Sequence, residues 1–212
     1  MPQDAEQRDQ SWLDTYGMVQ TIMADFPEFL PNTYDQYYLY PDYKVSHLDP
    51  NFTRADEVMA GREKRVFTEC AEVIKEGKLG DKFHAISDAH AEMMIKVAEA
   101  IAYNKNDRHI LIVENNGAIA NMQDDAMVEV VCELGINGPR PMRVGNIPQF
   151  NLGLLVNQVS CEKLIVDAYF ENSYQKALEA FTLNRLINDA KKARKVLDAL
   201  IEANKGMWPE LR

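Results

Sequence analysis

Three short apolar segments in the middle of the chain constrain the fold most. Segments 108–114 and 127–133 are rich in β-branched residues, which favour strands, and a shorter third segment covers 141–144. No helix-sized connection separates the last two segments, so an antiparallel arrangement is the natural way for them to pair. The sequence therefore predicts a small antiparallel sheet of three strands.

Helical patterns lie on both sides of these strands. Apolar residues there recur at three- and four-residue spacing. The predicted helices cover residues 5–26, 53–76, 88–103, the region after Pro148, and 187–203. Asn51 or Thr53 can cap the second helix and Ser173 a later one, whereas 42–50 and 135–141 are predicted to be loops. The prediction is an α+β fold, helix-rich with a small sheet, forming a single domain over residues 1–212.

The composition argues against several classes of protein. The 212 residues carry a formal net charge of -10, and an acidic surface repels the phosphate backbone of nucleic acids. No apolar run approaches the ~20 residues of a membrane-spanning helix, and the polar N-terminus lacks the pattern of a signal peptide. Cys70, Cys132 and Cys161 lie far apart, which argues against a disulfide framework or a zinc site. We therefore expect a cytoplasmic protein that binds neither nucleic acid nor membrane.

A tyrosine-rich stretch, residues 30–41, is the first candidate for a functional site. Prolines stand at both ends, and Asn32 and Thr33 suit a turn or helix cap directly before Tyr34. A tyrosine held at the edge of a rigid element can act as an acid or base, provided that its pKa, ordinarily about 10, is lowered. The alternative is an aromatic packing patch with exposed hydroxyls, which the residues alone favour.

Arg54 is the second candidate, because it falls in the first turn of a predicted helix. The helix dipole disfavours a cation there, whereas anions bind readily to the free backbone N–H groups. Arg54 beside such groups could bind a phosphate or a carboxylate. An ordinary surface arginine is the alternative, and the residues alone favour it.

Other sequence motifs are mostly absent. The chain contains no glycine-rich dinucleotide fingerprint, no P-loop, and neither of the common zinc-protease and serine-hydrolase motifs. His84 and His90 are not spaced to share a metal ion. Segment 112–121 carries three asparagines and a glutamate around Gly117, which predicts a turn within a packed, hydrogen-bonded loop at a site or an interface.

Together, several segments resemble the C-terminal half of family 4 glycoside hydrolases, specifically the bacterial 6-phospho-α-glucosidases that cleave maltose 6′-phosphate. The resemblance runs from Ser11 onward and implies a fold like the C-terminal domain of lactate dehydrogenase. The matching motifs occur in the family's order, at residues 30–34 with 36–39, 53–55 with 57–59, 100–104, 112–121, and 200–205 with 208–211.

The resemblance also implies a chemistry that does not use the usual pair of carboxylates. The family binds NAD and a divalent metal, commonly manganese, and the cofactor transiently oxidises the sugar at C3. A tyrosine then removes the acidified proton at C2, and the glycosidic bond breaks by elimination. The family's tyrosine base matches Tyr34, and its arginine on the substrate phosphate matches Arg54.

The same resemblance shows what these residues lack. The family begins with a Rossmann domain that carries the NAD site and the metal ligands, and no counterpart of that domain is present here. We therefore expect a truncated glycosidase of carbohydrate metabolism, inactive alone, that binds a phosphorylated sugar and forms homo-oligomers. An apolar face should be exposed where the Rossmann half would pack. The alternatives are a non-enzymatic remnant, one subunit of a split enzyme, or a 6-phospho-β-glucosidase or α-galactosidase of the same family.

Overall fold

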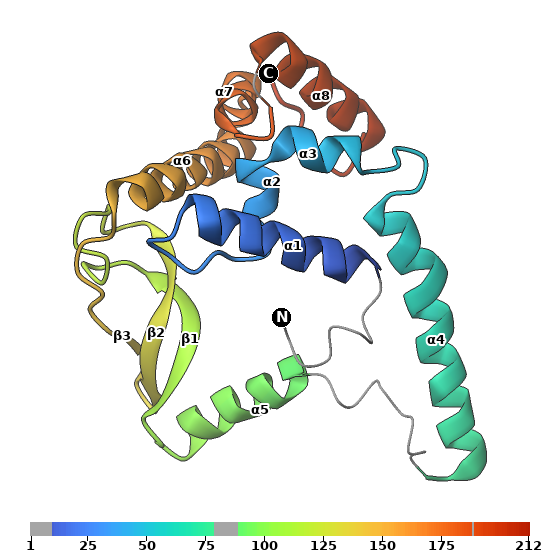
Figure 1. Cartoon of the computed structure of the whole chain (residues 1–212), viewed down its shortest axis with the longest axis vertical. Helices are drawn as coiled ribbons and strands as arrows, with labels where there is room; N and C mark the ends of the chain where they lie inside the picture. Colours follow the sequence, from blue (N-terminus) through green and yellow to red (C-terminus); the bar gives the residue numbers. More distant parts are fainter. Residues whose placement is uncertain (1–9, 79–88, 188) are drawn as a thin grey trace. The chain divides into compact units, whose positions relative to one another are not determined.

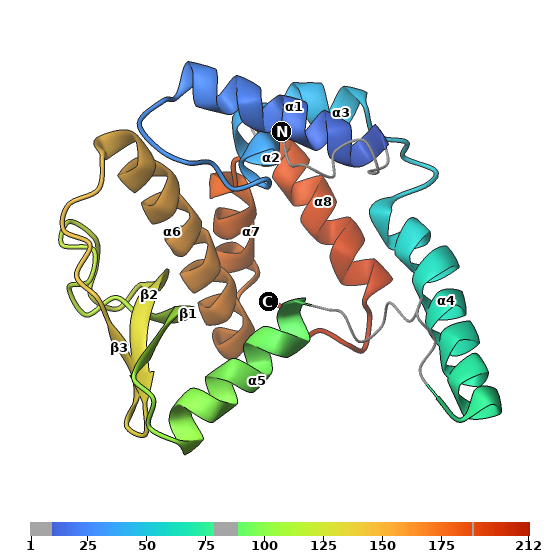
Figure 2. The same cartoon turned by 60° about the horizontal axis from the view of Figure 1, so that its bottom comes forward.

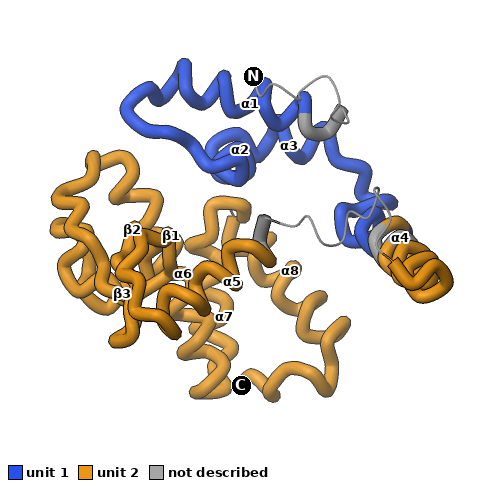
Figure 3. Tube along the Cα trace, turned by 90° about the horizontal axis from the view of Figure 1, so that it is seen from below, with its two compact units in different colours: residues 1–60 blue, residues 61–212 orange. Residues whose placement is uncertain are grey.

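The computed structural model describes residues 10–78, 89–187 and 189–212, which form two compact units (Figure 3). Unit 1 covers residues 1–60 and unit 2 covers 61–212, and each is described by itself. The elements are labelled in Figure 1. In chain order they are α1 (Gln10–Asp25), α2 (Asp35–Leu39), α3 (Pro41–Ser46), α4 (Arg54–Glu76), α5 (Ala89–Ala102), β1 (Asp107–Glu114), β2 (Met127–Gly135), β3 (Gly138–Pro141), α6 (Gln149–Glu171), α7 (Tyr174–Leu183) and α8 (Ala190–Ala203).

Unit 1 confirms the first predicted helix over Gln10–Asp25, while residues 5–9 of that prediction lie outside the described residues. It corrects the loop predicted at 42–50. Helix α1 buries Met18 and Ile22, and the hydroxyl of Tyr40 donates a hydrogen bond to the carboxylate of Asp25 at its end. Helix α3 occupies half of the predicted loop. Pro41 stands at its first position, where the fixed backbone angle of proline favours a helix start.

The three predicted strands form one antiparallel sheet in the order β1-β2-β3, as expected. The third strand was placed wrongly, because it covers Gly138–Pro141 rather than 141–144. Gly135 pairs with Gly138, so a two-residue turn joins β2 to β3 within the predicted loop 135–141. Gly138 adopts φ +87°, a left-handed conformation that glycine adopts without strain, and β3 therefore begins three residues earlier than expected.

One face of the sheet packs against α6 and forms the larger core of unit 2, as Figure 2 shows. Residues of β2 alternate between buried and exposed, as expected for a strand with one face on a core. The buried members of this core are Ala118, Ile119, Met122, Ala126, Val128, Val130, Cys132 and Val159. Leu152 of α6 and Leu111 of β1 pack against them.

The amide-rich connection between β1 and β2 is packed and hydrogen-bonded, as predicted. The Asn115 side chain is fully buried, and its Nδ2 donates to the carbonyls of Ile119, Met122 and Gln123 at 3.0, 3.2 and 3.1 Å. Its Oδ1 accepts from the Ile119 N–H at 2.7 Å. Asn121 bonds both backbone groups of Ile147. These two asparagines therefore replace regular secondary structure across a connection that is too long for a tight hairpin.

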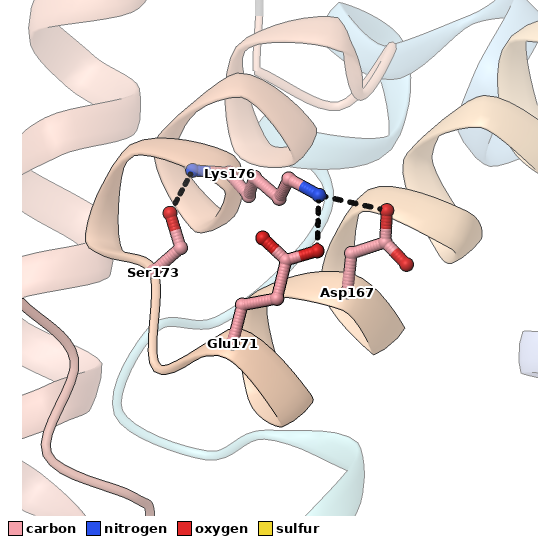
Figure 4. A network of polar contacts seen from close by, with 4 residues as sticks. All are labelled: Asp167, Glu171, Ser173 and Lys176. Carbon is pink, nitrogen blue, oxygen red and sulfur yellow. Dashed lines mark hydrogen bonds and ion pairs between the residues drawn. The ribbon is translucent and has the colours of Figure 1, made fainter.

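The corner between α6 and α7 is held by the network drawn in Figure 4. Ser173 caps α7 as predicted, because its hydroxyl accepts from the Lys176 N–H at 3.3 Å. The Lys176 ammonium reaches back to Glu171 at 2.6 Å and Asp167 at 3.1 Å. The hydrogen bonds to Glu171 and then to Asp167 raise the pKa of Lys176. Both carboxylates stand near the end of α6, so one side chain ties two helices together.

The remaining helices agree with the prediction except at their ends. Helix α4 begins one residue after Thr53, and α8 begins at Ala190 rather than 187 because the Asp189 side chain caps it at 2.8 Å from the Lys192 N–H. His84 lies outside the described residues, and His90 falls in the first turn of α5. Within the part of the chain that the structure describes, no helix has the length and apolarity to cross a membrane.

We predict that Asn115→Ala destabilises unit 2 by about 2–3 kcal/mol, because three carbonyls and one N–H lose a buried partner at once. Urea unfolding followed by circular dichroism measures this change in the free energy of unfolding. Asn146→Ala is the matched control on an exposed loop, and its change should stay within about 0.5 kcal/mol. Equal changes for the two variants would show that the buried amide does not hold the connection.

Candidate functional site

Tyr34 stands at the N-terminal end of α2, on a turn fixed by its neighbours. Asn32 Oδ1 accepts from the Tyr34 N–H at 2.9 Å, and Asp35 Oδ2 accepts from the Asn32 N–H at 2.8 Å. The buried side chain of Gln36 donates to the Thr33 carbonyl at 2.7 Å. Burial raises the pKa of Asp35, and the bond from the Asn32 backbone partly offsets this. The turn predicted before Tyr34 is therefore present and rigid.

The Tyr34 side chain itself is accessible. It is 67% exposed and stacks on Tyr37, with ring centroids 6.3 Å apart and planes inclined by 29°. Lys44 Nζ lies 5.2 Å from the centroid of the Tyr37 ring. A cation on an aromatic ring is a favourable contact. Sequence reasoning missed Lys44, because it lies in α3, where a loop was predicted.

Arg54 is the first residue of α4, as predicted. Thr53 caps the helix, because its N–H and hydroxyl donate to Asp56 Oδ2 at 2.8 and 2.7 Å, and the Asp56 N–H returns a bond at 3.4 Å. The hydrogen bond from the Thr53 hydroxyl is the main cause that lowers the pKa of Asp56. Arg54 pairs with Glu57 Oε2 at 2.5 Å, and both side chains are more than half exposed. A guanidinium and a carboxylate therefore share this helix start.

Both predicted site residues lie in unit 1, each at the start of a helix. The two side chains contact different residues. Tyr34 stacks on Tyr37, whereas Arg54 pairs with Glu57. These contacts do not by themselves join the two residues into one site. What the two positions share is an exposed functional group beside backbone that a nearby side chain fixes by hydrogen bonds.

The described residues offer no evident metal centre. Across residues 10–78, 89–187 and 189–212, no group of three or more His, Cys, Asp and Glu side chains could hold a metal ion. Cys132 and Cys161 are buried, and burial raises the pKa of both thiols, which disfavours the thiolate that binds metals. Cys161 lines an apolar groove of about 560 Å³ between α6 and α7. Burial therefore argues against Cys132 and Cys161 as metal ligands, whereas Cys70 is exposed.

Comparison with known proteins decides the family. The model of the family 4 glycosyl hydrolase C-terminal domain matches residues 2–187. The chain belongs to this family. The helix-rich fold with its three-stranded antiparallel sheet is that of the family's C-terminal domain.

Named relatives narrow the similarity to 6-phospho-α-glucosidases. A maltose-6′-phosphate glucosidase of Clostridium acetobutylicum is 49% identical over 209 residues, 98% of this chain and 47% of the relative. A probable 6-phospho-β-glucosidase of Bacillus subtilis is less similar, at 30% identity over 197 residues, 87% of this chain and 44% of that protein. The chain thus spans about half the length of the curated relatives that it matches.

Two crystal structures of 6-phospho-α-glucosidases from gut microorganisms have the same fold. The first, in complex with NAD and Mn²⁺, is 82% identical with a TM-score of 0.92, and the match covers 100% of this chain and 48% of that one. The second, in complex with NAD and glucose 6-phosphate, is 46% identical with a TM-score of 0.91 over 99% of this chain and 47% of that one.

We predict that Thr53→Val raises the pKa of Asp56 back toward the usual value of about 4. Because its pKa is lowered, the Asp56 carboxylate stabilises the start of α4 at pH values above its unfolded-state pKa. This stabilisation is lost as the pH falls through the lowered pKa. Carboxyl chemical shifts measured by NMR against pH give the pKa. Thr182→Val, which removes a hydroxyl bonded to the Leu178 carbonyl, should leave it unchanged.

Proposed function

We propose that this chain forms the substrate-binding half of a 6-phospho-α-glucosidase, in which Tyr34 is the base and Arg54 binds the substrate phosphate. The observation that carries the proposal is the position of both residues. Each matches its family motif, Tyr34 stands on a turn that Asn32 fixes, and Arg54 begins a helix that Thr53 caps. The substrate class follows the relatives, which are named for phosphorylated α-glucosides.

Tyr34 suits the removal of a proton that lies next to a carbonyl carbon of the sugar. Its phenol is exposed, so a substrate can reach it, and its backbone is fixed by the Asn32 bond at 2.9 Å. A fixed backbone limits the directions in which the phenol can point. The Tyr34 ring stacks on Tyr37, and Lys44 lies on the Tyr37 ring, so a cation stands in the same cluster of side chains.

Arg54 suits a phosphate that displaces an existing partner. The guanidinium pairs with Glu57 at a helix start, where backbone N–H groups also attract anions. A phosphate monoester carries up to two negative charges and three acceptor oxygens, so it competes well against a single exposed carboxylate. In this proposal Glu57 is the ion-pair partner of Arg54 until the substrate phosphate replaces it.

The roles that we assign to this chain do not include binding of the cofactors. In similar proteins NAD and Mn²⁺ are bound, but the described residues here do not form a donor set for a metal ion. We therefore assign to this chain only the proton transfer at Tyr34 and the phosphate contact at Arg54. NAD and metal binding belong, in this proposal, to a second half of the active enzyme. The α-linkage follows the higher identity to α-glucosidases than to the β-glucosidase.

We predict that Tyr34→Phe lowers turnover by at least about a hundredfold, because the variant keeps the ring but loses the proton acceptor. The assay measures hydrolysis of p-nitrophenyl α-glucoside 6-phosphate with NAD, Mn²⁺ and reductant. The 212-residue chain is tested alone and with the first half of the 82% identical relative added.

Tyr37→Phe is the matched control, because it removes the neighbouring hydroxyl and keeps the stacked rings. Its turnover should stay within about threefold of the parent chain. Turnover that needs the added half and disappears only in Tyr34→Phe supports the proposal. Full activity of Tyr34→Phe, or no turnover under any condition, contradicts it and favours the non-enzymatic alternative.

We predict separately that Arg54→Gln weakens binding of glucose 6-phosphate at least about tenfold, because a charge-assisted contact is lost. Isothermal titration of the 212-residue chain measures the affinity, with glucose as the ligand that lacks the phosphate. Glu57→Gln should tighten binding, since it removes the competing carboxylate. Arg143→Gln, at an exposed arginine of unit 2, is the control and should change nothing. Equal affinity of Arg54→Gln and the parent chain would contradict the assignment.

A further inference from the structure

Tyr40 forms hydrogen bonds with three helices of unit 1. Helices α1, α2 and α3 belong to this unit (Figure 3). The Tyr40 N–H donates to the Gln36 carbonyl of α2 at 3.1 Å, and the Tyr40 carbonyl accepts from the Lys44 N–H of α3 at 3.1 Å. The Tyr40 hydroxyl donates to the carboxylate of Asp25, the last residue of α1. The residue between two short helices therefore bonds to both of them and to a third.

The bond between Tyr40 and Asp25 is important because α2 and α3 have little apolar anchorage. None of the six residues of α3 is buried, and the residue that α2 buries is the polar Gln36. Helix α1, in contrast, buries Met18 and Ile22. Apolar burial is the dominant favourable term in folding. Where it is small, the orientation of the α2–α3 pair depends on specific polar contacts with the rest of the unit.

The stability of α1 does not explain why a carboxylate stands at position 25. The helix dipole disfavours an anion in the last turn of a helix, and α1 has no basic residue there to offset it. The hydrogen bond from Tyr40 gives the Asp25 carboxylate a role outside its own helix. The same bond is the main cause that raises the pKa of Tyr40. The Tyr40 phenol, with an ordinary pKa of about 10, therefore keeps its proton at neutral pH and remains a donor.

We propose that Asp25 and Tyr40 are positioning residues, whose hydrogen bond fixes the orientation of the Tyr34 ring. Tyr34 directly precedes α2, and its ring stacks on Tyr37 of α2. Lys44 of α3 lies on the same Tyr37 ring. These contacts span the joint between α2 and α3 at Tyr40, so a change in the angle between the helices moves the stacked rings. The catalytic meaning of this positioning rests on the function proposed above, whereas the orientation of the ring does not.

The first experiment is NMR of the 212-residue chain with isotope-labelled tyrosine rings. Tyr34→Phe identifies the Tyr34 signals, and Tyr37→Leu gives their position without the stacked neighbour. In Tyr40→Phe and in Asp25→Ala we expect the Tyr34 signals to move from the parent position toward the position in Tyr37→Leu. The double variant should move them no further than either single variant, because both changes remove the same bond.

Two controls separate this bond from a general loss of structure. Asp25→Asn keeps an oxygen that can accept from the Tyr40 hydroxyl, so its Tyr34 signals should stay near the parent position. Tyr174→Phe is the matched control in unit 2, because the Tyr174 hydroxyl also donates to an aspartate, Asp198, at 2.6 Å. It should leave the Tyr34 signals unchanged. Circular dichroism checks that each variant is folded, and Asp25→Ala tests the bond independently of Tyr40→Phe.

The second measurement is turnover of p-nitrophenyl α-glucoside 6-phosphate with the first half of the relative added. Tyr40→Phe and Asp25→Ala should lower kcat at least about tenfold, since small misplacements of a reacting group are costly. KM should stay within about threefold, because the phosphate contact proposed for Arg54 is kept. Tyr174→Phe should turn over like the parent chain.

The proposal is overturned if the Tyr34 signals of Tyr40→Phe and Asp25→Ala stay at the parent position, or if Tyr174→Phe moves them as much. It is also overturned if Asp25→Asn behaves like Asp25→Ala, or if the signals move while kcat does not change. Failure of the proposed function gives a different result, namely full activity of Tyr34→Phe or no turnover of the parent chain. The NMR signals then decide by themselves whether Asp25 and Tyr40 orient the ring.

Discussion

The buried amide of Asn115 is the interaction on which the fold of unit 2 depends. The connection between β1 and β2 is too long to be held by hairpin hydrogen bonds, so its backbone groups need other partners. One side chain supplies four of them, with distances between 2.7 and 3.2 Å. The connection can then fold over the core, and Ala118, Ile119 and Met122 are buried there. Because the strands are joined in this way, each keeps one face on α6 and the other face outside.

The candidate site depends on a similar use of short polar side chains in unit 1. Asn32 and Thr53 both bond to groups two or three residues away, and each fixes the backbone just before a helix. The functional groups of Tyr34 and Arg54 then project from fixed backbone into solvent. Rigid backbone with exposed side chains is what a site needs when the substrate must enter from outside. The hydrogen bonds of Asn32 and Thr53 therefore fix the backbone at both candidate positions.

The sequence predicted those parts of the structure that follow from periodicity and local capping. Strands β1 and β2 alternate because one face is buried, and the caps at Thr53 and Ser173 follow from side chains that reach only a few residues. Helix α3 was missed because the prolines and tyrosines around it fit a turn as well as a helix start. The shift of β3 came from a two-residue turn at Gly138, which has no apolar signal of its own.

The site was only partly predictable, for a different reason. The roles of Tyr34 and Arg54 came from the family resemblance, since their local residues alone favoured ordinary packing and surface roles. The pairing of Arg54 with Glu57 follows from three-residue spacing on a helix. The Lys44 contact with Tyr37 does not, because it depends on how α3 turns back toward α2. Contacts between elements require the path of the chain, which periodicity does not supply.

Several cations of the described residues are paired with carboxylates, and this pairing affects how they can bind a ligand. Arg54 pairs with Glu57, and Arg108 acts on Glu133, where both Arg140 and then Arg108 lower the pKa of the carboxyl. A ligand that binds such an arginine must therefore displace the glutamate with which it is paired. At a helix start a doubly charged phosphate can do so, whereas a single carboxylate gains nothing over Glu57. In the function proposed for Arg54, its pairing with Glu57 thus favours a phosphorylated sugar over an acidic sugar as the ligand.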